Sequence, residues 1–463
     1  MLNDKVKLLR PYQKEDAFFI AQHFACGVFN EQRTGKTPTT LIGLRTKKCK
    51  KILIVCPASM LIPWKNEFEK WYEAPCEICI GTPDKRQEIV YHKWTDGLVI
   101  SYDLLKDTKN RHGIVHQILD QQFDAIILDE AHKIKDRNSK TTQAIWLLKN
   151  KCQHKVALTG TPAPNYPYDI WPILHFLFPK YFRSYWKFIE EFFVVEERLN
   201  HSTNTKYKDI GTFKSRRKER ELQELLNKIA ISRKRKDVMP WLPPKTYTDI
   251  LLTPSKTQSD CLYHLQEYFE IPNTDIVCQG LLDRLTRYRQ ICVAPVLINK
   301  DHKHVLEQSP KLQWIKQYVS DYPNRPTIIF TKFTSIIKHI TPLFETYKCA
   351  VIDGTTTLKT RAEIIQDFQD GCINYLIANI DTCKEGITLD RAETTIFLDE
   401  YPPVATIEQA EDRFVSTKES KIKVNNHIIR LIMKGTYEEH IRELIKDHKN
   451  ETDIVNNFKQ FST

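Results

Sequence analysis

The sequence predicts an α/β fold made of two doubly wound parallel sheets with helical insertions, one sheet in each half of the chain. Three observations lead to this expectation. Short apolar runs rich in β-branched residues recur through both halves, as in strands that are buried on both faces. Polar turns and helical patterns separate these runs, as in repeated strand–helix units. The chain also has 463 residues, more than one hydrophobic core usually supports.

The expected strands follow in order along the chain. In the first half the apolar runs are 51–56, 98–102, 125–128 and 155–158, and in the second half they are 327–330, 349–352, 375–378 and 395–398. The aromatic stretch 170–193 is interpreted as the core of a helical subdomain, although its rings could also stack on nucleic-acid bases. Residues 200–211 are interpreted as a polar loop, and 251–308 mainly as helices.

These expectations divide the chain into three regions. We predict a first lobe over 1–240 with a helical and basic insertion at about 170–235, a helical linker over 241–305, and a second lobe over 306–463.

Composition limits the class of protein. Hydrophobic residues make up 41% and charged residues 27%, which is ordinary for a soluble globular protein. No apolar run approaches membrane-spanning length and the first residues lack a signal-peptide core, so we expect a cytoplasmic protein without membrane contact. Lys and Arg number 69 against 58 Asp and Glu, and the net charge of +11 suits a polyanionic partner. The scattered cysteines are expected to be reduced thiols, because the close pair Cys76 and Cys79 lacks further zinc ligands.

Two adjacent carboxylates, Asp129 and Glu130, follow the apolar run 125–128. Open α/β sheets bind ligands at the carboxyl ends of their strands. Asp129 can hold Mg²⁺ there through its water shell, and Glu130 can polarise the water that attacks a phosphate. A solvated acidic turn is the alternative for this dipeptide taken alone.

A phosphate-binding loop is predicted at 30–37, between an apolar run and a helical pattern. In such loops backbone N–H groups and a helix N-terminus surround the phosphates. Lys36 would reach the β- and γ-phosphates, and Thr37 would bind Mg²⁺. Asn30 replaces the usual first glycine of the motif. The loop residues expected to contact the nucleotide are Arg33, Thr34, Gly35, Lys36 and Thr37.

Two further side chains are candidates for the same nucleotide. Gln13 could bind an adenine edge with its paired donor and acceptor, although a surface role is the alternative. Arg413 could reach the γ-phosphate from the second lobe and neutralise charge in the transition state; taken alone, its helical context would be a solvated face. The basic clusters 214–220 and 233–236 fit contacts with a phosphate backbone, or again a solvated face.

Taken together, these residues closely resemble the SWI/SNF family of superfamily-2 helicase-like ATPases. The motifs that carry the resemblance are, in order, LRPYQ, the GKT loop, PASMLIPWKNEF, VISYDLL, ILDEAHKIKD, LTGTP, SRKRKDV, LPPK, YRQIC, SPKL, TIIFTKF, VIDGTTT, KEGITLDRA, QAEDR and IIRLIMKGTYEEHI. The resemblance implies two RecA-like lobes and the use of ATP and Mg²⁺. The short chain is similar to small phage-encoded members, some of which are similar to branch-migration DNA helicases. We expect a monomer, located in the host bacterial cytoplasm if the protein is phage-encoded.

The resemblance also implies roles for individual residues. ATP would be bound by Gln13, by the loop residues Arg33 to Thr37, and from the second lobe by Gly386, Gln409 and Arg413. Catalysis would involve Lys36, Asp129, Glu130 and Arg413; Mg²⁺ would be held by Thr37 and Asp129; and Thr159 and Thr161 would couple hydrolysis to DNA. DNA, bound by its backbone with little sequence specificity, would contact Pro57, Ala58, Ser59, Ser101, Thr331, Lys332, Gly354 and Thr388, besides Arg216, Arg217, Arg233 and Arg235 of the basic clusters.

One position departs from the family pattern. Ser416 stands three residues after Arg413, where the family has a second arginine. Loss of such a cation can lower turnover by roughly 10³ to 10⁵. Either Arg413, Lys418 or another cation substitutes for it, or hydrolysis is slow.

Three functions are compatible with these features. The first is a DNA-dependent ATPase that translocates on DNA and remodels branched structures in replication, recombination or repair. The second is a nucleotide-gated DNA clamp with little turnover, and the third is an RNA helicase of the same superfamily. Segments 57–68 and 430–441 fit the DNA-tracking family better than an RNA helicase. The sequence does not reveal partner proteins.

Overall fold

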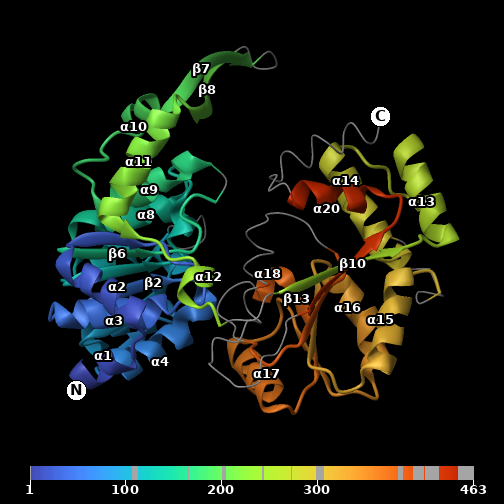
Figure 1. The fold of residues 1–463 in the computed structure, drawn as a ribbon, viewed down its shortest axis with the longest axis horizontal. Helices are drawn as coiled ribbons and strands as arrows, with labels where there is room; N and C mark the ends of the chain where they lie inside the picture. The colour runs from blue at the N-terminus through green and yellow to red at the C-terminus, as the bar shows by residue number, and fades with distance from the viewer. Residues whose placement is uncertain are drawn as a thin grey trace. The chain divides into compact units, whose positions relative to one another are not determined.

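The computed structural model describes residues 2–106, 113–164, 166–200, 205–241, 245–272, 274–298, 307–383, 389–399, 411 and 427–446. The chain forms two compact units, Met1–Pro240 and Trp241–Thr463, and each contains one parallel sheet (Figure 1). The predicted fold class is therefore confirmed. No helix within the described ranges is long and apolar enough to cross a membrane.

The first unit is built on a seven-stranded parallel sheet in the order β3-β4-β2-β5-β6-β1-β9. Its strands are β1 (Ala25–Val28), β2 (Ile52–Cys56), β3 (Cys76–Ile78), β4 (Gly97–Ser101), β5 (Ala125–Asp129), β6 (His154–Leu158) and β9 (Ala230–Ile231). Its helices are α1 (Leu2–Leu8), α2 (Pro11–Gln22), α3 (Lys36–Thr46), α4 (Leu61–Tyr72), α5 (Pro83–Glu88), α6 (Tyr102–Leu105), α7 (Val115–Leu119), α8 (Lys140–Leu147), α9 (Trp171–Leu177), α10 (Tyr185–Phe192), α11 (Arg216–Ile229) and α12 (Arg235–Val238). Because parallel neighbours cannot be joined by a tight turn, helices cross over the sheet between them.

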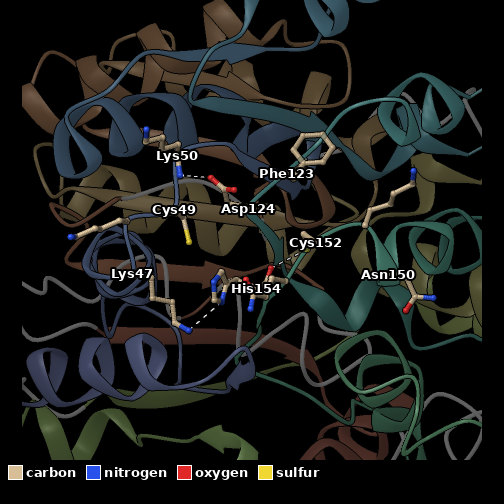
Figure 2. Close-up of a pocket in the computed structure, with 11 residues that line it drawn as sticks. Lys47, Cys49, Lys50, Phe123, Asp124, Asn150, Cys152 and His154 are labelled. Atoms are coloured by element: carbon tan, nitrogen blue, oxygen red, sulfur yellow. Dashed lines mark hydrogen bonds between the residues drawn. The ribbon is translucent and has the colours of Figure 1, made fainter.

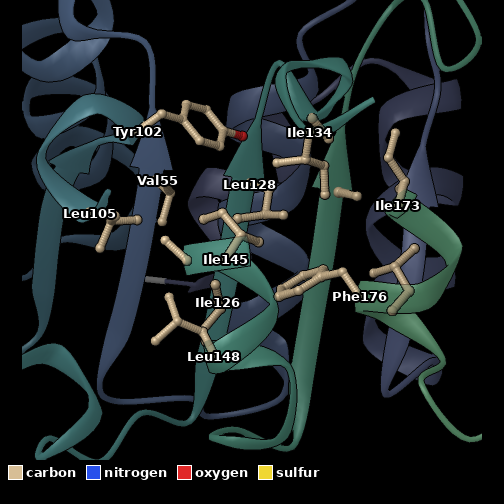
Figure 3. Packing of buried hydrophobic residues seen from close by; sticks show 14 of the residues in the cluster. Val55, Tyr102, Leu105, Ile126, Leu128, Ile134, Ile145, Leu148, Ile173 and Phe176 are labelled. Carbon is tan, nitrogen blue, oxygen red and sulfur yellow. The ribbon is translucent and has the colours of Figure 1, made fainter. Parts of the chain in front are cut away.

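Both faces of this sheet are buried, as the continuous apolar runs predict. Alternate residues of one strand point to opposite faces, so Ile126 and Leu128 of β5 pack in one core and Ile127 in the other. Figure 3 shows the first core, where Ile145 of α8 and Phe176 of α9 cover the strands. Helices α3 and α4 cover the opposite face through residues that include Leu41, Trp64 and Phe68.

The expectation of a polar loop over 200–211 is wrong. Strands β7 (Phe193–Asn200) and β8 (Thr205–Phe213) form an antiparallel hairpin that extends away from the sheet beside α10 and α11 (Figure 1). Cross-strand pairs stabilise it: Arg198 lies 3.1 Å from Asp209, and the rings of Phe193 and Phe213 stack at its base. The strand looks like a loop in sequence because its pairs are polar and solvent-exposed.

The second unit is built on a six-stranded parallel sheet in the order β10-β15-β14-β11-β13-β12. Its strands are β10 (Thr246–Leu252), β11 (Thr327–Thr331), β12 (Cys349–Ile352), β13 (Tyr375–Asn379), β14 (Thr394–Phe397) and β15 (His427–Met433). Its helices are α13 (Lys256–Glu267), α14 (Leu281–Val293), α15 (Pro310–Asp321), α16 (Thr334–Ile340), α17 (Leu358–Asp370), α18 (Ile380–Cys383) and α20 (Tyr437–Lys446). The segment 241–305 thus contributes strand β10 to this sheet as well as the expected helices, and residues of α13 and α14 pack in its core.

Candidate nucleotide-binding site

The phosphate loop lies between β1 and α3, as the sequence predicts. Gly35 immediately precedes α3 with φ +81°, in the left-handed region that favours glycine. A Cβ atom at this position would lie 2.1 Å from Nε2 of Gln13, so a side chain here would displace the Gln13 amide from the loop. Arg33 has φ 64° as well, which makes this loop the site of two left-handed residues. The backbone therefore has the sharp turn that a phosphate cradle requires.

Helix α2 fixes the loop from one side. The hydroxyl of Tyr12 donates to the carbonyl oxygen of Thr34 at 2.8 Å, and Nε2 of Gln13 donates to the same oxygen at 3.0 Å. Oε1 of Gln13 accepts from the backbone N–H of Arg10 at 2.9 Å. Gln13 is thus buried against the loop, and its amide holds the loop carbonyl. Its adenine-binding role stays a prediction.

The ammonium of Lys36 lies over the loop. Its Nζ donates to the carbonyl oxygens of Asn30 at 3.0 Å and Glu31 at 3.3 Å. These are contacts with neutral acceptors, so a phosphate with full negative charge would be a stronger partner for the same ammonium. Thr37, in the first turn of α3, is half-buried beside it.

The structure explains why Asn30 can replace the usual glycine. Its Nδ2 donates to Oδ2 of Asp16 at 2.8 Å, and Asp16 is fully buried. The guanidinium of Arg233 pairs with the other oxygen of Asp16 at 2.8 Å, and the backbone N–H of Arg235 donates to Glu31 at 2.8 Å. The segment after β9 therefore anchors the start of the loop. A DNA phosphate would have to compete with Asp16 for Arg233.

The paired carboxylates stand at the carboxyl end of β5. Asp129 and Glu130 are 7% and 8% exposed. Oδ2 of Asp129 accepts from the indole Nε1 of Trp64 at 2.7 Å, and the hydroxyl of Tyr102 donates to its carbonyl oxygen at 2.8 Å. Burial raises the pKa of Asp129 above its ordinary value, and the adjacent charge of Glu130 adds to this; the Trp64 hydrogen bond and Lys36 act in the opposite direction. A divalent cation bound here would stabilise the charged form of Asp129, which burial and the charge of Glu130 disfavour.

The backbone of Glu130 is in a strained conformation. Its φ is 49°, in the left-handed region, and its Oε2 is buried and accepts no hydrogen bond from the part of the chain described. His132 lies 3.4 Å from this oxygen through Nδ1, and the same nitrogen lies 3.0 Å from Oγ1 of Thr159. Thr159 in turn accepts from the backbone N–H of Thr161 at 3.1 Å. A chain of polar contacts thus runs from Glu130 to the two predicted coupling threonines.

These residues fit ATP and Mg²⁺. The loop holds a glycine where a Cβ would meet the Gln13 amide, with a lysine over its carbonyls, and the buried oxygen of Glu130 has no hydrogen-bond donor among the described residues. Among the described side chains no group of three or more His, Cys, Asp and Glu could hold a metal ion by itself. Mg²⁺ at phosphate sites uses one or two protein ligands with waters and phosphate oxygens, so Thr37 and Asp129 suffice as its protein ligands.

The predicted DNA contacts of the first unit have different environments. Pro57 and Ser101 are buried at the ends of β2 and β4, whereas Ala58 is exposed and Ser59 half-buried in the turn after β2. Arg216 and Arg217 are exposed on α11. Ala58 and Ser59 are therefore accessible to a DNA phosphate backbone. The side chain of Ser101 is buried and does not face solvent.

In the second unit, Lys332 and Gly354 are exposed and Thr331 is buried. Oδ1 of Asp399 accepts from the Thr331 hydroxyl at 2.8 Å and from the backbone N–H of Lys332 at 3.0 Å, and its other oxygen pairs with Arg289 at 3.2 Å. Thr331 therefore shapes the turn that presents Lys332. The predictions for Gly386, Thr388, Gln409, Arg413 and Ser416 fall outside the described residues.

Sequence reasoning missed the residues that hold the site in place. Trp64, Tyr12, Asp16 and His132 each contact a predicted site residue. The spacing of Trp64 with other apolar residues of α4 predicts that it is buried. It gives no sign of a partner 65 residues away.

A phosphate loop on a parallel sheet, with two buried carboxylates at the end of a strand of that sheet, defines a nucleoside-triphosphate-binding protein of the P-loop class. The SNF2-related domain matches residues 20–297, and the helicase conserved C-terminal domain matches residues 310–418. The chain therefore belongs to the SNF2 family of superfamily-2 helicase-like ATPases, which confirms the resemblance seen in its motifs.

Relatives are similar over most of this chain. It is 28% identical over 461 residues to an uncharacterized ATP-dependent helicase of Mycoplasma pneumoniae, a match covering 94% of this chain and 41% of that protein. It is 26% identical over 420 residues to the human DNA annealing helicase and endonuclease ZRANB3, covering 89% and 37%. The chain thus spans about two fifths of the length of these relatives. The SWI2/SNF2 ATPase core of Sulfolobus solfataricus, solved in complex with dsDNA, is 22% identical with a TM-score of 0.43 and coverage of 95% and 91%.

Proposed function

We propose that this protein is a DNA-dependent ATPase that translocates on DNA and remodels branched structures, as in fork unwinding or branch migration. One observation carries the proposal: a single lobe holds a lysine-bearing phosphate loop together with a buried carboxylate pair, of which one oxygen has no hydrogen-bond donor in the part of the chain that the structure describes. Such a pair is useful where a cation and an attacking water must be placed beside a phosphate. Membership of the SNF2 family supports this assignment.

In this proposal each residue of the lobe has a distinct task. Lys36 leaves the loop carbonyls and neutralises the β- and γ-phosphates, while the N–H groups around Gly35 bind their oxygens. Thr37 and Asp129 would hold Mg²⁺, which would neutralise phosphate charge. Glu130 orients the attacking water. His132 contacts both Glu130 and Thr159, and so links the position of this water to the coupling residue Thr159.

DNA as the partner is supported by two observations. The relatives include a DNA annealing helicase, ZRANB3, and the human DNA repair and recombination protein RAD54B. The net charge of +11 favours a polyanion, and phosphate contacts would give binding with little sequence specificity. We further propose that the protein acts as a monomer in the cytoplasm.

A nucleotide-gated DNA clamp is the second candidate. Ser416 favours it, because this position lacks the second arginine of the family pattern. The clamp would bind ATP and DNA with the same residues and release both without much hydrolysis.

Steady-state ATP hydrolysis separates the two candidates. It is measured without DNA and with single strand, plain duplex, fork, four-way junction and duplex RNA, with Lys36→Ala as the blank. If the protein is a motor for branched DNA, fork or junction DNA should raise the rate of ATP hydrolysis at least tenfold above the Lys36→Ala blank, and duplex RNA should not. Tight DNA binding with turnover equal to the Lys36→Ala blank on every substrate would leave the clamp.

A further inference from the structure

A second polar site lies at the opposite edge of the first sheet. Strands β2, β5 and β6 are neighbours and parallel, so their amino ends share the edge away from Asp129. A pocket of about 790 Å³ opens there. Its walls are the three turns that precede these strands, with residues 47–50, 123–124 and 150–154 (Figure 2). This volume lies within the range of ligand sites in proteins.

The pocket carries an excess of positive charge. The lysines that line it are Lys47, Lys48, Lys50 and Lys151. Asp124 is the one carboxylate among the lining residues, and its Oδ2 accepts from the backbone N–H groups of Lys50 at 2.6 Å and Lys51 at 3.0 Å. Backbone donors therefore already occupy Asp124, and it neutralises at most one of the four ammonium groups.

Three of these lysines, unlike several others of the same unit, have no carboxylate partner among the described residues. Lys48, Lys50 and Lys151 are exposed and form no ion pair with any residue that the structure describes. Elsewhere in the unit many lysines lie within 4.0 Å of a carboxylate, among them Lys5, Lys65, Lys93, Lys106, Lys208 and Lys218. An evenly solvated surface would mix the two signs of charge at this edge too. The pocket instead leaves its cations available to an external anion.

An exposed aromatic ring stands beside the lysines. Phe24 is 60% exposed and stacks on His154 with ring centroids 5.4 Å apart. Lys47 lies 4.9 Å from the Phe24 ring, and its Nζ lies 3.1 Å from Nδ1 of His154. Burial lowers the pKa of both Lys47 and His154 from their ordinary values. Cations next to an accessible ring match a ligand that has both phosphates and flat bases.

We propose that this pocket binds a segment of single-stranded DNA, with its phosphates on Lys48, Lys50 and Lys151 and a base stacked on Phe24. The inference rests on the proposed function, because a fork offers an unpaired arm besides the duplex on which the motor moves. A duplex hides the faces of its bases, so stacking on Phe24 requires an unpaired strand. An acidic peptide would match the lysines but would leave the ring unused.

The site is separate from the nucleotide. Helix α3 begins at Lys36 in the phosphate loop and ends at Thr46 beside the pocket, and its 11 residues span about 16 Å. Changes in the pocket should therefore weaken strand binding without altering ATP hydrolysis on plain duplex.

The test compares two triple variants of the full chain that lose equal charge. The pocket variant is Lys48→Gln, Lys50→Gln, Lys151→Gln, and the control is Lys70→Gln, Lys85→Gln, Lys180→Gln, all exposed in the same unit. Binding of labelled oligo-dT is followed by fluorescence anisotropy over a salt series without nucleotide. The pocket variant should bind at least tenfold more weakly than the control, and its slope of log K against log salt should fall by about 2. Phe24→Ala should weaken binding about tenfold relative to Tyr181→Ala, a ring that is 86% exposed.

Equal oligo-dT affinity and salt slope in both triple variants would overturn the proposal. Poly-glutamate that binds the wild type, and loses affinity in the pocket variant while oligo-dT does not, would overturn it in favour of an acidic peptide. Failure of the proposed function is a different result, in which no DNA stimulates hydrolysis by the wild type. A difference between the two triple variants in oligo-dT binding would support the pocket even then, because that measurement needs no hydrolysis.

Discussion

The contact between Trp64 and Asp129 shows how one residue controls the candidate site. Asp129 is almost completely buried, and its carboxylate could rotate unless a donor fixed it. The indole N–H of Trp64, itself 1% exposed, donates to Oδ2 at 2.7 Å and turns the other oxygen toward the backbone N–H of Glu130. A hydrogen bond to a charged acceptor contributes about 1.5–3 kcal/mol. Trp64 is thus a positioning residue for the proposed Mg²⁺ ligand.

Trp64→Phe keeps most of the apolar packing and removes this donor. We expect kcat to fall roughly 10- to 100-fold, in line with the loss of about 1.5–3 kcal/mol. The concentration of Mg²⁺ at half-maximal rate should rise as well, because a freely rotating carboxylate binds the cation less well. Both values come from ATP hydrolysis titrated with Mg²⁺.

Trp71→Phe is the matched control for this variant. Trp71 lies on the same helix and its Nε1 donates to Glu67 at 2.8 Å, away from the site. It should leave the Mg²⁺ titration unchanged. Equal Mg²⁺ curves for the two variants would contradict the positioning role and leave Trp64 as a packing residue.

At the scale of single residues, the sequence predicts the members of short motifs but not the residues that hold them in position. Lys36, Asp129 and Glu130 are recognisable because each stands at a fixed place relative to a strand or helix. Trp64 and Asp16 are not, because their partners come from distant parts of the chain that only the folded sheet brings together.

At the scale of elements, the short strand β9 anchors the phosphate loop. It pairs with β1 through two residues, Ala230 and Ile231, and the chain then delivers Arg233 to the buried carboxylate of Asp16. Asp16 also accepts from Asn30 at the start of the loop. A two-residue strand is too short to show a periodic pattern, and the sequence does not reveal that Arg233 pairs with Asp16. The basic cluster 233–236 is therefore interpreted from the sequence as a candidate for DNA contacts.

Arg233→Ala distinguishes an anchor from a DNA contact. Breaking a buried ion pair costs roughly 3–5 kcal/mol, so the free energy of unfolding of the first unit should fall by a few kcal/mol, with weaker ATP binding. The slope of DNA affinity against salt should stay the same. Denaturant unfolding, equilibrium ATP binding and a salt series of DNA binding give the three values.

Arg217→Ala serves as the reference for that experiment. Arg217 is 87% exposed and pairs with Glu221 on the surface of α11. It should leave stability almost unchanged. If Arg233→Ala instead lowered the salt slope by about 1 at unchanged stability, Arg233 would be a phosphate contact.

At the scale of the whole molecule, the two sheets are predictable because parallel strands buried on both faces need continuous apolar runs. The edge strand β10 and the hairpin β7–β8 are harder to predict from the sequence. Strand β10 alternates between exposed and half-buried residues at the edge of its sheet, and the hairpin β7–β8 depends on exposed cross-strand pairs. Their sequences satisfy the pattern of loops as well as that of strands.

In the proposed motor the two units would contribute different groups to ATP hydrolysis, since Arg413 belongs to the second unit. The first unit contains the phosphate loop and the carboxylate pair, so it should bind ATP without help from Arg413. We expect Arg413→Ala to bind ATP with nearly the wild-type affinity and to lose DNA-stimulated hydrolysis by a factor of roughly 10³ or more, because the transition state then lacks its cation. Ser416→Ala should hydrolyse ATP like the wild type, since a hydroxyl supplies no positive charge. Equilibrium ATP binding and DNA-stimulated hydrolysis of both variants measure this, and wild-type turnover in Arg413→Ala would show that another cation, such as Lys418, stabilises the transition state.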